Sequence, residues 1–216
     1  MFGLLNRMFG ISPTRPSLDA VGFDTTGYEL AGVLVPGHLR VWNTPEGDQL
    51  GVHFFGVPPD LPAAASVDEL ADFYRRLIAG CPGSKVARLV ETTVVVAGGC
   101  PAIRLIVSVP QEPFGRACVG SLTVPFRDLS FVLKCQVRER GLTGVKEALL
   151  LHRRWSAEES PRPLTEGPPW DPDAPEHDVE FPGHPVARAR RILDHVQATL
   201  TLAEPVRRLP GFPLPI

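Results

Sequence analysis

The order of strand-like and helix-like segments constrains this chain most. A pair of short strand-like runs is followed by an amphipathic helical pattern, then by four more strand-like runs in succession and by a second helical pattern. Strands that follow one another without intervening helices favour antiparallel pairing, and helices grouped with them cover the faces of the sheet. We therefore expect an α+β fold with a mostly antiparallel sheet of about six strands covered by helices, an α/β/α sandwich.

The first half of the chain contains a predicted hairpin and the clearest predicted helix. Residues 38–43 and 49–56 are strand-like runs on either side of residues 44–48, which contain the turn formers Pro45 and Gly47. Ser66 and Glu69 have the spacing of a capping box, which predicts that a helix begins at Ser66. The helix is expected to end near Gly80.

Four strand-like runs follow, at residues 86–97, 102–109, 117–124 and 129–137. In the second run we expect the apolar residues 103, 105, 107 and 109 to form one face, with Arg104 and Ser108 on the other. If residues 125–128 form the loop of the last hairpin, residues whose numbers sum to 253 face each other. That register places Cys118 opposite Cys135, both as small buried thiols.

The remainder of the chain is predicted to contain two helices separated by an acidic segment. Thr143 can cap a helix that ends near Ser156, and residues 158–182 then carry eight acidic side chains against one arginine. A third helix starts near Pro185. Its first turns contain Arg188, Arg190 and Arg191, which oppose the helix dipole and so suggest a partner such as the acidic segment.

These patterns divide the chain into four parts. They are an N-terminal segment (1–27), a core domain (28–157), an acidic proline-rich linker or strap (158–183), and a C-terminal helix with an extended tail (184–216). The third helix either completes the sandwich of its own chain or clasps a second subunit, and a homo-oligomer is possible.

Composition excludes several classes of protein. The formal charge of −2 argues against nonspecific nucleic-acid binding, which needs a basic surface. No run is long enough to cross a bilayer, and the apolar stretch at residues 1–10 is too short for a signal peptide, although it offers a weak possibility of contact with a membrane surface. The four cysteines lie 17 to 19 residues apart, which is unlike a zinc site. We expect a cytoplasmic protein without a cofactor.

One cluster of residues raises the possibility of metal-dependent chemistry. Carboxylates and imidazoles are common metal ligands, and several of them occur close together at Asp171, Asp173, Glu176, His177, Asp178 and His184. The spacing lacks the features of an EF-hand loop, and no GxSxG motif is present. We therefore do not expect an enzyme, and a small metal-dependent hydrolase using residues 171–184 is retained as an alternative.

Three short segments carry a resemblance to a known group. They are Gly47–Leu50 leading the second strand, Ser66–Leu70 opening the first helix, and the run from Val94 to Arg104 with its Gly-Gly-Cys-Pro-Ala turn. With the order of elements over residues 28–155, they resemble the Mog1/PsbP-like α/β/α sandwich group, which includes DcrB-type bacterial proteins and Eag-type chaperones of type VI secretion. The resemblance implies a binding protein without catalytic residues, since members engage a small GTPase, a photosystem or the membrane segments of secreted effectors.

The leading hypothesis is a noncatalytic adaptor or accessory protein that binds a protein partner. Aromatic and arginine residues are the usual anchors of protein interfaces. The predicted partner-binding residues are accordingly Trp42, Phe55, Trp170, Arg188 and Arg191. The alternative is an effector chaperone or immunity-type protein that binds one apolar segment in a groove.

Overall fold

The computed structural model describes residues 16–63, 65–81, 87–111, 115–157 and 170–214. The fold is α+β and is built on a seven-stranded antiparallel sheet in the order β2-β3-β4-β8-β7-β6-β5. Its strands are β2 (Glu29–Val35), β3 (Leu39–Asn43), β4 (Gln49–Phe55), β5 (Arg88–Ala97), β6 (Cys100–Pro110), β7 (Arg116–Pro125) and β8 (Ser130–Arg138). Two meanders, β2 to β4 and β5 to β8, join where β4 pairs with β8.

The first helix, α1 (Val67–Gly80), begins as its capping box predicts. Ser66 Oγ accepts a hydrogen bond from the Glu69 amide, and the Ser66 amide donates to Glu69 Oε2 at 2.7 Å. The helix lies along the edge strand β5. There Leu70 and Tyr74 pack with Ile103 and Leu214 in a small second core.

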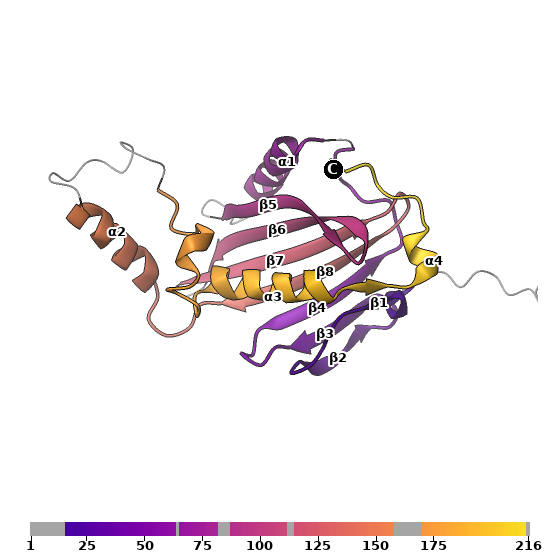
Figure 1. The fold of residues 1–216 in the computed structure, drawn as a ribbon, viewed down its shortest axis with the longest axis horizontal. Coiled ribbons are helices and arrows are strands. Elements are labelled where there is room, and N and C mark those ends of the chain that lie inside the picture. The colour runs from indigo at the N-terminus through magenta and orange to yellow at the C-terminus, as the bar shows by residue number, and fades with distance from the viewer. Residues whose placement is uncertain (1–15, 64, 82–86, 112–114, 158–169, 215–216) are drawn as a thin grey trace, which may run out of the picture.

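Helix α3 (Pro185–Thr199) covers the opposite face of the sheet, across β7 and β8 (Figure 1). Leu193 and Val196 are fully buried there. Gly120 permits this close approach, because a Cβ atom at that position would lie 3.1 Å from Leu193 Cδ1 and 2.8 Å from Cys135 Sγ. The third predicted helix therefore completes the sandwich of its own chain.

The two ends of the described chain belong to the same core as the sheet. The strand β1 (Val21–Gly22) pairs with β9 (Thr201–Leu202), just after α3. The short helices are η2 (Leu18–Ala20), η3 (Pro175–His177) and α4 (Glu204–Arg207). Leu18 and Val206 lie in one hydrophobic cluster with Leu193, so segments that the sequence suggested as separate parts are packed together.

Helix α2 (Val145–Ala157) is placed differently from the other two long helices. Figure 1 shows it set apart from the sheet, beyond the ends of the strands. It is connected to the rest of the fold at its first turn, where Lys146 is buried, and further along at the buried Leu150 and at Arg153, which binds Glu180. The second helical layer that we expected is thus formed by α1, which lies over β5, and α2 does not contribute to it.

The strand count and one strand register differ from the prediction. The sheet has seven strands rather than about six, and the additional strand is β2. Its apolar side chains are exposed on both sides, so its sequence lacks the alternation that identifies a half-buried strand. In the β7–β8 hairpin, Cys118 lies opposite Val137 and Gly120 lies opposite Cys135. The loop occupies residues 126–129, one residue later than predicted, so the paired numbers sum to 255.

The alternation expected along β6 is present, but its polar face is the one turned toward α3. Arg104 and Ser108 are buried, and Arg104 binds Asp194 of α3, whereas Val107 and Val109 on the other side are half-buried. The polar side chains are tolerated because Arg104 finds carboxylate partners there. Alternation along a strand identifies its two faces, and it does not tell which of them a helix will cover.

Two predicted features lie outside the described residues: the apolar stretch at residues 1–10 and the acidic stretch at residues 158–169. Of the helices described, none combines the length and the hydropathy needed to cross a membrane.

Candidate functional site

A buried ion pair lies where the β3–β4 turn meets the first turns of α3. The Arg188 guanidinium contacts both oxygens of the Asp48 carboxylate: Nε lies 3.0 Å from Oδ2, and Nη2 lies 3.0 Å from Oδ1. Both side chains are almost fully buried. Arg140 adds a hydrogen bond of 2.8 Å to Asp48 Oδ1. Burial raises the pKa of Asp48, and the two arginines oppose that rise.

Arg188 also donates hydrogen bonds to two backbone carbonyl oxygens. It donates to the carbonyl of Gly183, just before α3, and to the carbonyl of Arg138, at the end of β8. A single guanidinium thereby joins the sheet, the β3–β4 turn and the start of the helix. Its planar set of five donors is suited to such multiple contacts.

The next arginine of α3, Arg190, binds the acidic segment. Its Nη1 donates to both oxygens of Asp178, at 3.0 and 2.9 Å, and its Nη2 donates to the carbonyl of Asp173 at 2.6 Å. Its Nε donates to Glu91, which also accepts from Arg104. The part of the acidic segment from residue 170 onward is therefore a strap that is bound to α3, as the arginines of that helix suggested.

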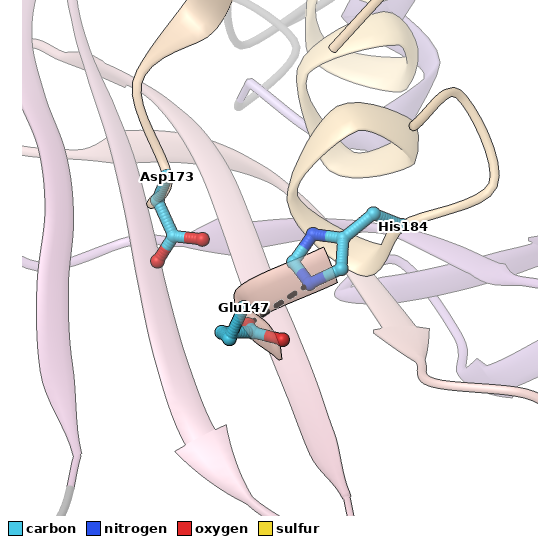
Figure 2. Close-up of side chains that lie close together, drawn as sticks. All are labelled: Glu147, Asp173 and His184. Atoms are coloured by element: carbon cyan, nitrogen blue, oxygen red, sulfur yellow. Dashed lines mark ion pairs between the residues drawn. The ribbon is translucent and has the colours of Figure 1, made fainter. Parts of the chain in front are cut away.

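A third group of charges links the strap to α2, and Figure 2 shows its acidic and imidazole members. Glu147 Oε1 lies 3.5 Å from His184 Nε2. His184 also caps α3, because its Nδ1 accepts a hydrogen bond from the Val186 amide. Lys146 Nζ lies 3.4 Å from the same Nδ1 and 3.7 Å from Asp173 Oδ1. We call Lys146, Glu147, Asp173 and His184 the α2 anchor.

The charges of the α2 anchor perturb one another. The neighbouring His184 imidazole lowers the pKa of Glu147 to about 2. Burial lowers the pKa of Lys146, which nearby carboxylates counteract. His184 Nδ1 accepts from the Val186 amide, and its Nε2 faces Glu147.

The anchor contains the ligand types of a metal site, but cations already occupy its surroundings. One atom each of Glu147, Asp173 and His184 lies within 4.8 Å of the others. The ammonium group of Lys146 lies between Asp173 and His184, and Arg88 is also paired with Asp173. A metal ion bound to these side chains would therefore be repelled by two positive groups, so ion pairing is the chemistry that this arrangement suits best.

The other residues of the suggested metal cluster are drawn to different partners. Asp178 binds Arg190, and Asp171 accepts a hydrogen bond from the Asp173 amide. Glu176 and His177 belong to η3. Of the six residues, the structure brings Asp173 and His184 together. Glu147 and Lys146 lie beside them, and the sequence pattern did not indicate either residue.

The five predicted partner-binding residues do not form one surface. Trp42 is half-buried and packs edge-on against Phe23, with ring centroids 5.1 Å apart. Phe55 is exposed on the other face of the sheet, and Trp170 is half-buried where the described strap begins. Arg191 is half-exposed and binds Glu46 and the Pro182 carbonyl. Arg188 is buried in the Asp48 pair, which makes it unsuitable as a partner contact.

A different surface collects exposed apolar side chains. On α2, Val145, Leu149 and Trp155 are each more than 40% exposed, and Leu142 just before the helix is 85% exposed. A cavity of about 340 Å³ adjoins this surface between the start of α2 and residues 180–185. Leu142, Val145 and Phe181 are among its apolar walls, and Lys146 and His184 of the α2 anchor also line it.

Comparisons with known proteins give a likeness of fold alone. No family model matches the chain, and no curated protein matches it. Among solved structures, the chain is similar to cyanobacterial PsbP (CyanoP) from Synechocystis sp. PCC 6803, with 13% identity over 87% of this chain and 89% of that one, and a TM-score of 0.40. At this identity and TM-score the likeness carries no statement about family or function.

Two arginines on α3 provide a matched test of the buried pair. Arg188→Met leaves Asp48 buried with Arg140 as its remaining partner, so we expect a loss of about 3 kcal/mol in the free energy of unfolding. Arg191→Met removes a half-exposed pair with Glu46 and should cost less than about 1 kcal/mol. Urea denaturation measures both values. Equal losses in the two variants would contradict the role given to Arg188.

The lowered pKa of Glu147 predicts how stability depends on pH. Its ordinary value is 4.5 and its folded value is about 2, so ionised Glu147 contributes stability that is fully present above pH 4.5 and is lost as the pH falls toward 2. We expect Glu147→Gln to be less stable than the wild type at pH 7, with the difference shrinking between pH 4.5 and 3. Chemical denaturation at each pH measures it. Glu176→Gln, on an exposed residue, is the control, and a difference that does not change with pH would contradict the assignment.

Proposed function

We propose that this protein is a noncatalytic adaptor that binds another protein, and that α2 is its docking element. The observation that carries the proposal is the exposed apolar stripe of Val145, Ala148, Leu149 and Trp155 on that helix. An isolated amphipathic helix normally buries such a stripe against its own domain. In this fold α3, and not α2, packs across the strands of the sheet.

The attachment of α2 supports a binding role. The α2 anchor fixes the first turn, and two turns further on Arg153 donates both Nη groups to the carboxylate of Glu180. The helix is therefore held in one orientation before any partner arrives. A docking element that is already ordered loses less conformational entropy on binding.

The composition of the surface also fits a protein partner. Tryptophan and arginine are enriched among residues that dominate binding energies, and here Trp155 lies beside Arg153 and Arg154. The adjoining cavity at Leu142 and Phe181 offers space for one or two apolar side chains. We propose a partner that presents an apolar segment to α2.

The resemblance to the Mog1, DcrB and Eag branches agrees with this proposal and does not choose among them. A cavity of this size is too small to enclose a whole helix, so the adaptor is favoured over a chaperone that encloses an apolar segment in a groove. The metal-dependent hydrolase is not favoured, since Arg88 and Lys146 already neutralise Asp173. A cytoplasmic location remains part of the proposal.

Site-specific photo-crosslinking in the native host tests the docking role of α2. We expect a photoreactive phenylalanine analogue at Leu149 to crosslink to one protein species, and the same analogue at Val179, which is 90% exposed on the strap, to give no such species. Trp155→Asp should remove the Leu149 product while leaving the thermal midpoint unchanged, because Trp155 is exposed. Mass spectrometry identifies the product.

Two results would contradict the proposal. One is a crosslinking pattern from Leu149 that matches the pattern from Val179. The other is a Leu149 product that persists in the Trp155→Asp variant.

A further inference from the structure

The sheet has one edge strand that no described element covers. At one edge, β5 is accompanied by α1. At the other edge, β2 pairs with β3 alone, and Leu30, Val33, Leu34 and Val35 are all between 47% and 67% exposed. An edge strand presents a row of unpaired N–H and C=O groups to its surroundings. Apolar side chains on both faces of such a strand favour another strand as its neighbour.

The sequence of β2 lacks the charges that usually prevent such pairing. The strand reads Glu-Leu-Ala-Gly-Val-Leu-Val, with neither lysine nor proline between Glu29 and Val35. Lysine and proline on edge strands are common protections against association. Two register shifts on the β3 side leave Ala31 and Leu34 without partners on β3, and they increase the local twist of the strand.

We propose that two copies of this chain form a dimer by antiparallel pairing of β2 with β2 across a twofold axis at Gly32. Pairing over the whole strand requires that facing residue numbers sum to 64. Leu30 then faces Leu34 of the second copy, Ala31 faces Val33, and Gly32 faces its own equivalent. A twofold contact needs a surface that complements itself, and this register meets that requirement with apolar pairs on both faces.

The position of the charged residue in β2 favours a second copy of this chain as the neighbour of that strand. The single charged residue of the strand, Glu29, faces Val35 of the other copy, so the two carboxylates lie at opposite ends of the strand pair. Six residues at about 3.4 Å each separate them by roughly 20 Å. Like charges that face each other across strands are destabilising, and this arrangement has none.

The glycine at the proposed axis is compatible with close approach of two chains. A Cβ atom added to Gly32 meets no other atom within 4 Å, and the residue does not have a positive φ. A cysteine at this position is therefore expected to fit. Across an antiparallel pair, facing Cα atoms are roughly 4.5–5.5 Å apart, which is within the range that a disulfide spans.

The dimer is independent of the proposed partner contact at α2. A single strand pair is a small interface, so we expect dimerisation to depend on protein concentration. Sedimentation equilibrium of the full chain measures the state directly. The wild type and Val96→Lys, which alters a 66% exposed valine on the β5 edge strand, should both dimerise, whereas Leu34→Lys should sediment as a folded monomer.

A disulfide trap tests the register. In a Cys81→Ser background, which removes the exposed thiol, Gly32→Cys should oxidise to a covalent dimer much faster than Val96→Cys does. A wild type that remains monomeric at the highest attainable concentration overturns the proposal, as does a dimer that Leu34→Lys leaves intact. Equal oxidation of Gly32→Cys and Val96→Cys overturns the register at Gly32.

Discussion

The structure depends first on the buried ion pair between Asp48 and Arg188. Its cost in desolvation is offset by the attraction of the paired charges at 3.0 Å, by Arg140 and by the two backbone carbonyls that Arg188 also binds. Because the pair connects the β3–β4 turn, the end of β8 and the first turns of α3, it sets where α3 starts on the sheet. The apolar contacts of Leu193 and Val196 follow from that placement.

From this pair the charges continue outward through the strap to α2. Arg190 binds Asp173 and Asp178, Asp173 is paired with Arg88 and lies beside Lys146, and Glu147 lies against His184. Ionic contacts can hold the base of α2 without covering its apolar stripe. The same device that attaches the helix therefore leaves a surface available for a partner, which is the basis of the adaptor proposal.

Much of the fold follows from local sequence, and the site does not. Ser66 and Glu69 identify the start of α1 because a capping box is a local interaction, and the arginines of α3 indicate a partner in the acidic strap because they oppose the helix dipole. By contrast, β2 was missed because an exposed edge strand shows no alternation. Asp48, Glu91 and Glu147 could not be identified, because their partners lie far along the chain: 92 and 140 residues away for Asp48, 99 for the Arg190 contact of Glu91, and 37 for the His184 contact of Glu147. The covered face of β6 depends on where α3 packs, which the strand itself does not encode.

The most direct test of this account is hydrogen exchange in the wild type and in Asp173→Asn, which removes the carboxylate shared by Arg88 and Lys146. If the ionic contacts hold α2 on the fold, amides of residues 145–157 and 170–184 exchange faster in the variant while those of β7 and β8 keep their protection. Unchanged protection of α2 in Asp173→Asn would contradict the central claim, since the helix would then be held by something other than these charges.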